Sequence, residues 1–342
     1  MEPTPNADDE RTPTIRRITL GNTVFEGKNN VYLVDADGSL GLVDAGVATD
    51  ETRRELEDGL ATAGYDVSDI DEIVLTHWHA DHAGLAGELQ AESGATVRVH
   101  AADAALVAGD DDARADYRER EERRFEEWQL PADARTELRS FLDAHEDVQG
   151  SSATVTTFED GDRLHLGGVA LDVVHLPGHT AGLCGFAIGG SDAPEGREAF
   201  VGDAVLPKYT PNVGGADLRV TEPLAKYVES LGRVIDADWS RLWPGHRDPI
   251  DAPATRAQVI LDHHRERTRR VVDVLRTHGP CDVWTVSAAL FGGLEKIHIL
   301  HGPGEAWAHL DHLTAHGVVE RDGHEYRLLD ADVDVASLFP DG

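Results

Sequence analysis

Short apolar runs followed by glycine-containing polar motifs recur along the first 250 residues. Residues 71–76 form an apolar run typical of a buried strand, and residues 83–92 follow it with leucines at helical spacing. Further strands are predicted at residues 169–175 and 199–201, each ending near a glycine that allows a tight turn. The polar motifs are therefore expected on loops that follow strands, where functional groups usually lie.

The pattern changes between residues 101 and 150. Residues 110–127 are intensely charged, with aromatic side chains at helical intervals, and a second helical stretch, residues 132–145, follows Pro131. We interpret these stretches as a two-helix insertion at about residues 103–150. The insertion either overhangs a site on the strand-ending loops or only packs on the surface, and we favour the first alternative.

The last quarter of the chain has its own set of elements. The predicted elements are helices at residues 255–278, 285–291 and 304–316, followed by a hairpin at residues 318–329. The hairpin turns at Asp322-Gly323, a dipeptide that favours the tight turn it needs. Three helices and a hairpin predict a small winged-helix-like domain over residues 255–330, separate from a larger domain over residues 14–250.

The chain is strongly acidic. Its 64 acidic and 31 basic residues give a formal net charge of −33 over 342 residues, and the acid is spread throughout. This pattern, with few lysines, resembles the composition of halophilic, haloarchaeal proteins. In molar salt the Debye length is about 3 Å, so the mutual repulsion of these charges is largely screened.

Other segments bear on the cellular compartment. Residues 1–13 are polar, acidic and contain prolines, and we expect a disordered lead-in there. No run approaches the roughly 20 apolar residues of a membrane span. Cys184 and Cys281 fall in different predicted domains, so no disulfide framework is indicated. A cytoplasmic protein without a membrane contact is therefore expected.

The segment from Thr76 to Gly84 reads T-H-W-H-A-D-H-A-G and is the richest in chemistry. Three imidazoles and one carboxylate fall within six positions: His77, His79, Asp81 and His82. These groups together suit zinc, manganese or iron(II). The alternative, a polar turn whose histidines face solvent, leaves such crowding without a reason.

Three later motifs offer further ligands. His179 lies in a Pro-Gly-His-Thr motif, Asp203 in a Gly-Asp motif and His246 in a Pro-Gly-His motif, each after a predicted strand. Each motif alone is a common turn, but their order and spacing together give a strong signal.

The four motifs together resemble those of the metallo-β-lactamase superfamily, in its dinuclear hydrolase branch, whose best-known members are the hydroxyacylglutathione hydrolases (glyoxalase II). The resemblance covers about residues 14–250 and implies an α/β fold: an αβ/βα sandwich of two mixed sheets, here with a helical insertion and the added winged-helix-like domain. It implies a first metal ion on His77, His79 and His179, and a second on Asp81, His82 and His246. Asp203 would bridge the two ions. The implied cofactors are two divalent metal ions, with zinc favoured over iron or manganese, and Asp81 and Asp203 are the carboxylates of the implied catalytic centre.

Other residues have more general roles. Asp44 matches a superfamily position near the ligands, where it would hydrogen-bond a ligand histidine; the alternative is a turn-forming aspartate before Gly46. Lys208, Tyr209 and Asn212 follow Asp203 on a proline- and glycine-rich loop and are candidates for substrate contacts. The remaining C-terminal histidines are interpreted as surface or packing residues: His263, His264, His298, His301, His309, His312 and His316.

Three functions compete. The first is metal-dependent hydrolysis of a small acyl thioester or ester by a hydroxide that two metal ions share; a thiolate leaving group, with a pKa near 8.5, needs little acid assistance. The second is a single-strand-specific endoribonuclease, because the C-terminal region resembles the winged-helix extension of a β-lactamase-like branch that includes such enzymes. RNA binding, however, calls for a basic groove with aromatic platforms, which this acidic chain does not indicate.

The third function is a non-enzymatic winged-helix regulator. The helix predicted at residues 304–316 contains no Lys or Arg, which disfavours a role in reading DNA. We therefore expect a small-molecule acyl substrate rather than nucleic acid. The winged-helix-like domain would serve packing or homodimer formation.

Overall fold

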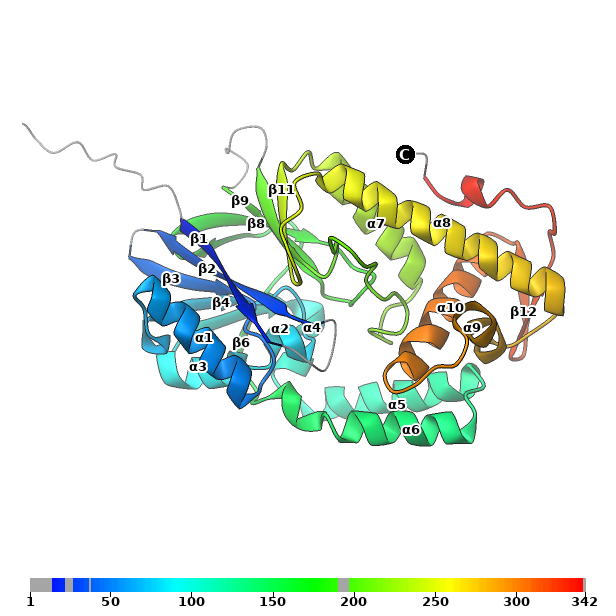
Figure 1. Ribbon diagram of the computed structural model, residues 1–342, viewed down its shortest axis with the longest axis horizontal. Coiled ribbons are helices and arrows are strands. Elements are labelled where there is room, and N and C mark those ends of the chain that lie inside the picture. The colour runs from blue at the N-terminus through cyan, green and yellow to red at the C-terminus, as the bar shows by residue number, and fades with distance from the viewer. Residues whose placement is uncertain (1–13, 22–26, 37, 190–196, 341–342) are drawn as a thin grey trace, which may run out of the picture.

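The computed structural model describes residues 14–21, 27–36, 38–189 and 197–340, and the expected lead-in at residues 1–13 lies outside them. Two sheets pack face to face, with helices on their outer sides (Figure 1). The six strands of the first sheet run in the order β1 (Thr14–Leu20), β2 (Asn29–Ala36), β3 (Ser39–Val43), β4 (Glu72–Val74), β5 (Thr96–His100) and β6 (Val155–Phe158). The five strands of the second are β11 (Arg241–Pro244), β10 (Glu198–Gly202), β9 (Cys184–Ile188), β8 (Val169–His175) and β7 (Arg163–Leu166).

Both sheets are mixed. In the first, β1, β2 and β3 pair antiparallel, whereas β3 to β6 pair parallel. In the second, only the β10–β11 pair is parallel. The space between the sheets is filled by large apolar side chains, among them Tyr32, Phe158, Phe186 and Phe200. This dry layer fixes the two sheets against each other and brings the ends of their strands to a common edge.

Helices cover the outer faces and connect the strands. A second core cluster joins the first sheet to the helices that flank it, and a third joins the second sheet to α7 and the C-terminal helices. The helices of the sandwich are α1 (Asp50–Ala63), α2 (Ala80–Ala83), α3 (Ala86–Ser93), α4 (Ala101–Val107) and α7 (Pro223–Asp236). Short 3₁₀ turns lie at Val67–Asp69, Glu146–Gln149 and Val335–Leu338.

The predicted helical insertion is present as α5 (Asp111–Glu127) and α6 (Ala132–Asp143). The two helices lie side by side along the lower edge of the molecule in the view of Figure 1, below α9 and α10. Phe125, Trp128 and Leu138 from this pair are fully buried in the core cluster that also contains the C-terminal helices. The insertion therefore packs against the C-terminal helices through a shared apolar core.

The C-terminal elements are three helices and a hairpin, in the predicted order. They are α8 (Pro253–His278), α9 (Val283–Phe291), α10 (His298–Ala315), β12 (Val319–Asp322) and β13 (Glu325–Leu328). Their apolar side chains share one core cluster with α7 and the second sheet. Among the described residues, then, no break in the core separates this region from the sandwich.

The largest difference from the predicted boundaries is at the start of α10. The third C-terminal helix begins at His298 rather than at Gly304, and Pro303 lies inside it. A proline removes one backbone hydrogen bond and normally marks a helix boundary. Here every residue from Gly302 to Leu310 is buried, so packing against the rest of the molecule outweighs the lost bond.

Two smaller predictions can also be checked. Cys184 and Cys281 are both free, buried thiols. In the described residues, no helix combines the length and apolar character needed to cross a membrane.

Candidate metal centre

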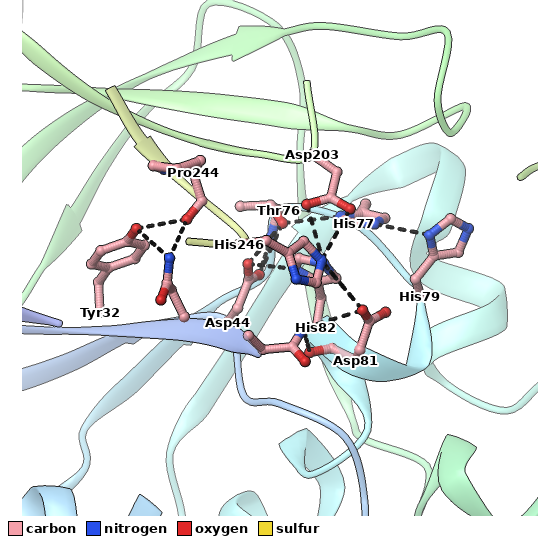
Figure 2. Close-up of polar contacts among 12 residues, drawn as sticks. Tyr32, Asp44, Thr76, His77, His79, Asp81, His82, Asp203, Pro244 and His246 are labelled. Atoms are coloured by element: carbon pink, nitrogen blue, oxygen red, sulfur yellow. Dashed lines mark hydrogen bonds and ion pairs between the residues drawn. The ribbon is translucent and has the colours of Figure 1, made fainter. Parts of the chain in front are cut away.

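The predicted ligand residues converge at the edge where the strands of both sheets end. His77 and His79 follow β4, and Asp81 and His82 lie on the short helix α2. His179 follows β8, Asp203 directly follows β10 and His246 follows β11. Figure 2 shows side chains of this set pointing toward one another from separate segments. Their potential ligand atoms form three overlapping sets, and within each set all atoms lie within 4.8 Å of one another. The sets are His77, His79 and His179; His77, His82 and Asp203; and Asp81, His82 and His246.

Two glycines make this approach possible. A Cβ atom at Gly245 would lie 2.4 Å from Asp203 Oδ1 and 2.5 Å from His82 Cε1. Gly202 has a φ of +48°, and a Cβ there would lie 2.6 Å from the Thr76 hydroxyl. The glycines of the Pro-Gly-His and Gly-Asp motifs thus leave space for the neighbouring polar side chains.

In the first group, His77, His79 and His179 each direct one unprotonated ring nitrogen toward a common point. The outer nitrogens of two rings donate to backbone carbonyls: His79 Nε2 to Ala216 at 3.0 Å and His179 Nδ1 to Asn212 at 2.9 Å. His77 Nδ1 lies 3.1 Å from the Thr76 hydroxyl, which itself donates to a carboxylate and so accepts from the ring. Each outer contact leaves the inner nitrogen of the ring as an acceptor.

These three inner nitrogens crowd together. His79 Nδ1 lies 3.0 Å from His77 Nε2 and 3.2 Å from His179 Nε2. Nitrogen lone pairs at such distances repel unless a cation lies between them, and imidazoles about 2.0–2.1 Å from a zinc ion would have this spacing. The donor set therefore fits a metal ion.

The second group combines the imidazoles of His82 and His246 with the carboxylate of Asp81. His82 Nδ1 donates to Asp44 Oδ2 at 2.8 Å, and His246 Nδ1 donates to the Lys28 carbonyl at 3.1 Å. The inner Nε2 atoms of both rings are buried and have no hydrogen-bond partner among the described residues. His246 Nε2 lies 3.5 Å from Asp81 Oδ2. A second cation would satisfy these unpaired atoms.

Asp203 lies between the two groups. Its Oδ1 is 3.5 Å from His82 Nε2, and its Oδ2 is 3.8 Å from His179 Nε2 and 3.4 Å from His246 Nε2. The Oδ1 atom is buried, and no residue that the structure describes hydrogen-bonds it. One carboxylate thus faces the histidines of both groups, as a bridging ligand would.

The site has the electrostatics of a cation site. Burial and the neighbouring His179 lower the pKa of His79 to about 4, so its ring is neutral at pH 7. Burial also disfavours the charged form of His246, but Asp203 and Asp81 outweigh this effect and raise its pKa to about 10. Positive charge is therefore stabilised beside the two aspartates, where a metal ion would replace the proton.

A cavity of about 740 Å³ opens from this centre. His79, Asp81, His179 and Asp203 form part of its wall, and the two helices of the insertion form another part. The side chains contributed by these helices include Arg114, Tyr117, Arg118, Arg139 and Phe141. The insertion thus shapes a pocket beside the candidate metal centre, and guanidinium groups line it although the chain as a whole is acidic.

Of the three residues predicted to contact substrate, only Asn212 lies at the cavity. Asn212 lines the cavity, whereas Lys208 and Tyr209 do not. Tyr209 is 46% exposed, and its backbone carbonyl accepts a hydrogen bond from Arg256. The side chain of Asn212 contacts Glu305 and the His301 carbonyl, both on α10.

His301 was not expected to reach the site. It lines the cavity from α10 together with Leu300, and Ile297 lines it from the residue just before that helix. Burial, together with the nearby imidazoles of His298, His179 and His79, lowers its pKa to about 3, so it is a neutral ring beside the centre. The signal in the sequence was hidden because Pro303 and the adjacent glycines made residues 298–303 look like a loop.

Comparisons with known proteins agree with this geometry. Residues 24–246 match the metallo-beta-lactamase superfamily. The chain is 28% identical over 295 residues to a probable metallo-hydrolase, YqjP, of Bacillus subtilis, covering 83% of this chain and 87% of that protein. The structure of the present chain resembles that of a metallo-beta-lactamase family protein from Thermus thermophilus. The TM-score is 0.72, and the two are 29% identical over 92% of this chain and 98% of the other. A beta-lactamase domain protein from Burkholderia ambifaria shares the fold, with a TM-score of 0.70, 22% identity and 92% coverage of each chain.

Proposed function

The chain belongs to the metallo-β-lactamase superfamily of metallo-hydrolases, and we propose that it hydrolyses small acyl thioesters or esters at a dinuclear metal centre. His77, His79 and His179 would hold the first ion. Asp81, His82 and His246 would hold the second, and Asp203 would bridge them. Zinc is the favoured metal, because imidazole and carboxylate ligands with short spacing suit it. The main support is that both groups of ligands border one cavity.

The bound ions would supply a hydroxide at neutral pH by lowering the pKa of a shared water to near 7. The side chains of the protein would orient the metal ligands and enclose the substrate. Trp78, Phe141 and Leu142 give the cavity apolar surface for an acyl group. Arg114 offers positive charge for an anionic part of the substrate, whereas Arg139, which also lines the cavity, is already paired with Glu121 and Glu122. A thiolate leaves without prior protonation at neutral pH, which suits a cavity whose His301 is neutral.

We assign the C-terminal region a packing role, as a winged-helix-like unit that supports the cavity. The helix α10 has no Lys or Arg among its 18 residues, which speaks against a nucleic-acid-reading helix. Its side chains instead form part of the cavity wall and of the common core. The free thiols of both cysteines and the acidic composition favour the cytoplasm of a halophilic cell as the compartment.

The test is a metal count followed by parallel assays. Protein purified in molar KCl should hold two divalent ions per chain and hydrolyse acyl thioesters, and Asp203→Ala should lose metal and activity together. The same preparations are given single-stranded RNA. Cleavage of RNA without thioester hydrolysis would overturn the substrate class, and a wild-type protein without stoichiometric metal would overturn the centre itself.

A further inference from the structure

A short segment of the loop after β10 controls two ligands of the first metal group. The carbonyl of Asn212 accepts from His179 Nδ1 at 2.9 Å, and the carbonyl of Ala216 accepts from His79 Nε2 at 3.0 Å. Such outer contacts decide which ring nitrogen carries the hydrogen and where the other one points. The position of residues 212–216 therefore sets the aim of two of the three nitrogens.

This segment is fastened to α10. Glu305 Oε2 accepts from the Asn212 side-chain amide at 3.1 Å and from the Val213 backbone N–H at 3.2 Å. The Asn212 amide also donates to the His301 carbonyl at 3.1 Å. The backbones are close enough that a Cβ on Gly304 would lie 2.3 Å from the Cα of Gly215. Residues 212–216 therefore cannot shift without breaking these hydrogen bonds or clashing with α10.

Glu305 is itself held as a buried carboxylate. It is 4% exposed, and its Oε1 lies 3.0 Å from Arg267 Nη1 of α8. Burial raises the pKa of Glu305, but the neighbouring imidazole of His309 and the charge of Arg267 outweigh burial and bring it to about 2. The group is thus ionised at every pH at which the protein would work.

The same carboxylate belongs to a cluster that could be mistaken for a third metal site. His264, Glu305 and His309 present ligand atoms within 4.8 Å of one another. Arg267 already neutralises the carboxylate, however, and a divalent ion beside its guanidinium would add uncompensated buried positive charge. His309 also donates Nδ1–H to the Thr268 hydroxyl at 2.7 Å, because that hydroxyl donates to the His264 carbonyl. A network that orients Glu305 explains the cluster without a metal.

We propose that Glu305 is a positioning residue for the first metal ion: through Asn212 and Val213 it fixes the segment whose carbonyls aim His179 and His79. The inference rests on the proposed metal centre. It gives the C-terminal helices a positioning role in addition to packing, because a carboxylate on α10 orients, through Asn212 and Val213, two histidines of the sandwich.

The test measures zinc affinity at each metal site separately. In a His246→Ala background, which disables the second site, Glu305→Gln should weaken zinc binding about 10–100-fold, the effect typical of an outer partner of a ligand. In a His179→Ala background, which disables the first site, the same substitution should leave zinc affinity unchanged. Glu266→Gln is the matched control, because Glu266 is exposed on α8 and pairs only with Arg269 among the described residues. Zinc is titrated against a chromophoric chelator in molar KCl, and circular dichroism of the metal-free proteins monitors folding.

A second variant covers the case in which Glu305→Gln does not fold. Asn212→Ala removes the amide that contacts Glu305 but keeps the carbonyl that accepts from His179, and it should weaken the first site in the same direction. Unchanged affinity of the first site in a variant that folds, or an equal loss at both sites, would overturn the positioning role. A wild-type chain that binds no zinc would instead overturn the proposed centre, so the two failures are distinguishable.

Discussion

Asp44 accepts a 2.8 Å hydrogen bond from His82 Nδ1, and the same carboxylate accepts from the Thr76 backbone N–H at 2.7 Å and from its hydroxyl. Asp44 has a φ of +64°, a left-handed conformation that aspartate and asparagine tolerate better than most residues. Figure 2 shows the Asp44 carboxylate beside the ring of His82. One buried side chain therefore orients a ligand of the second group and secures the loop on which the first group begins.

Asp44→Asn should weaken binding of the second metal ion about 10–100-fold, because an amide orients the His82 ring less firmly than a carboxylate does. The first ion should be affected less, since the Thr76 contacts can persist in part. Zinc titration in the His179→Ala background gives the measurement. Asp238→Asn is a suitable control, as Asp238 is exposed and also has a positive φ of 49°. Equal affinities of the variant and the control would contradict the orienting role.

Gly245→Ala should damage the centre although it adds one methyl group. The new Cβ would lie 2.4 Å from Asp203 Oδ1, so the carboxylate or the loop must shift. Overpacking of this kind costs about 1–3 kcal/mol, and here we expect it to lower metal occupancy as well. Gly232→Ala in α7 is the control, because nothing lies within 4 Å of its added Cβ and alanine favours a helix. Metal content and urea unfolding are compared, and full occupancy in Gly245→Ala would contradict the close packing described.

Arg114→Gln should raise KM for anionic acyl substrates about 10-fold while leaving kcat nearly unchanged. Arg114 lines the cavity and forms no ion pair with any residue that the structure describes, so its charge is available to a ligand. Removing an interaction that is equal in the ground state and the transition state raises KM alone. A neutral ester of similar size is the control substrate. A loss of kcat, or an equal loss for the neutral ester, would rule out a charge-binding role.

The stability of the metal-free protein should depend on pH through Glu305. The pKa of Glu305 is about 2 in the folded protein, below the ordinary glutamate value of 4.5. The stabilisation that follows from this lowering is present above pH 4.5 and is lost as the pH falls toward 2. Glu305→Gln should therefore be less stable than the wild type at pH 6 by about 1–3 kcal/mol, with the gap narrowing below pH 4.5. Chemical denaturation at several pH values checks this, and a gap independent of pH would exclude the carboxylate as its source.

Salt should stabilise the fold by screening. The net charge is −33, and the Debye length grows from about 3 Å at 1 M salt to about 10 Å at 0.1 M. Lowering KCl from 2 M to 0.1 M should reduce the unfolding temperature by at least about 5 °C, more than the shift from about 1 kcal/mol in a chain of this size. Sucrose added at 0.1 M KCl separates general preferential exclusion from charge screening. An unfolding temperature that does not change with KCl would contradict the halophilic interpretation.

Much of the centre could be predicted from the sequence because its parts are local. Four polar residues fall within six positions of Thr76–Gly84, and the later motifs each combine a strand end, a glycine and one polar residue. The helices of the insertion and the C-terminal hairpin were likewise visible, because periodicity and turn residues act over short windows. These features depend on neighbours in the chain.

The tertiary structure decided which of the other polar residues reach the centre. His301 and Glu305 lie on α10, whose start was not predicted because of Pro303. Only the packing of α10 against residues 212–216 brings His301 to the cavity and Glu305 to Asn212, whose carbonyl accepts from His179. Lys208 and Tyr209 are nearer in sequence to Asp203 but lie away from the cavity. The sequence by itself therefore determined the metal-binding chemistry, whereas long-range packing determined which side chains aim the ligands and line the pocket.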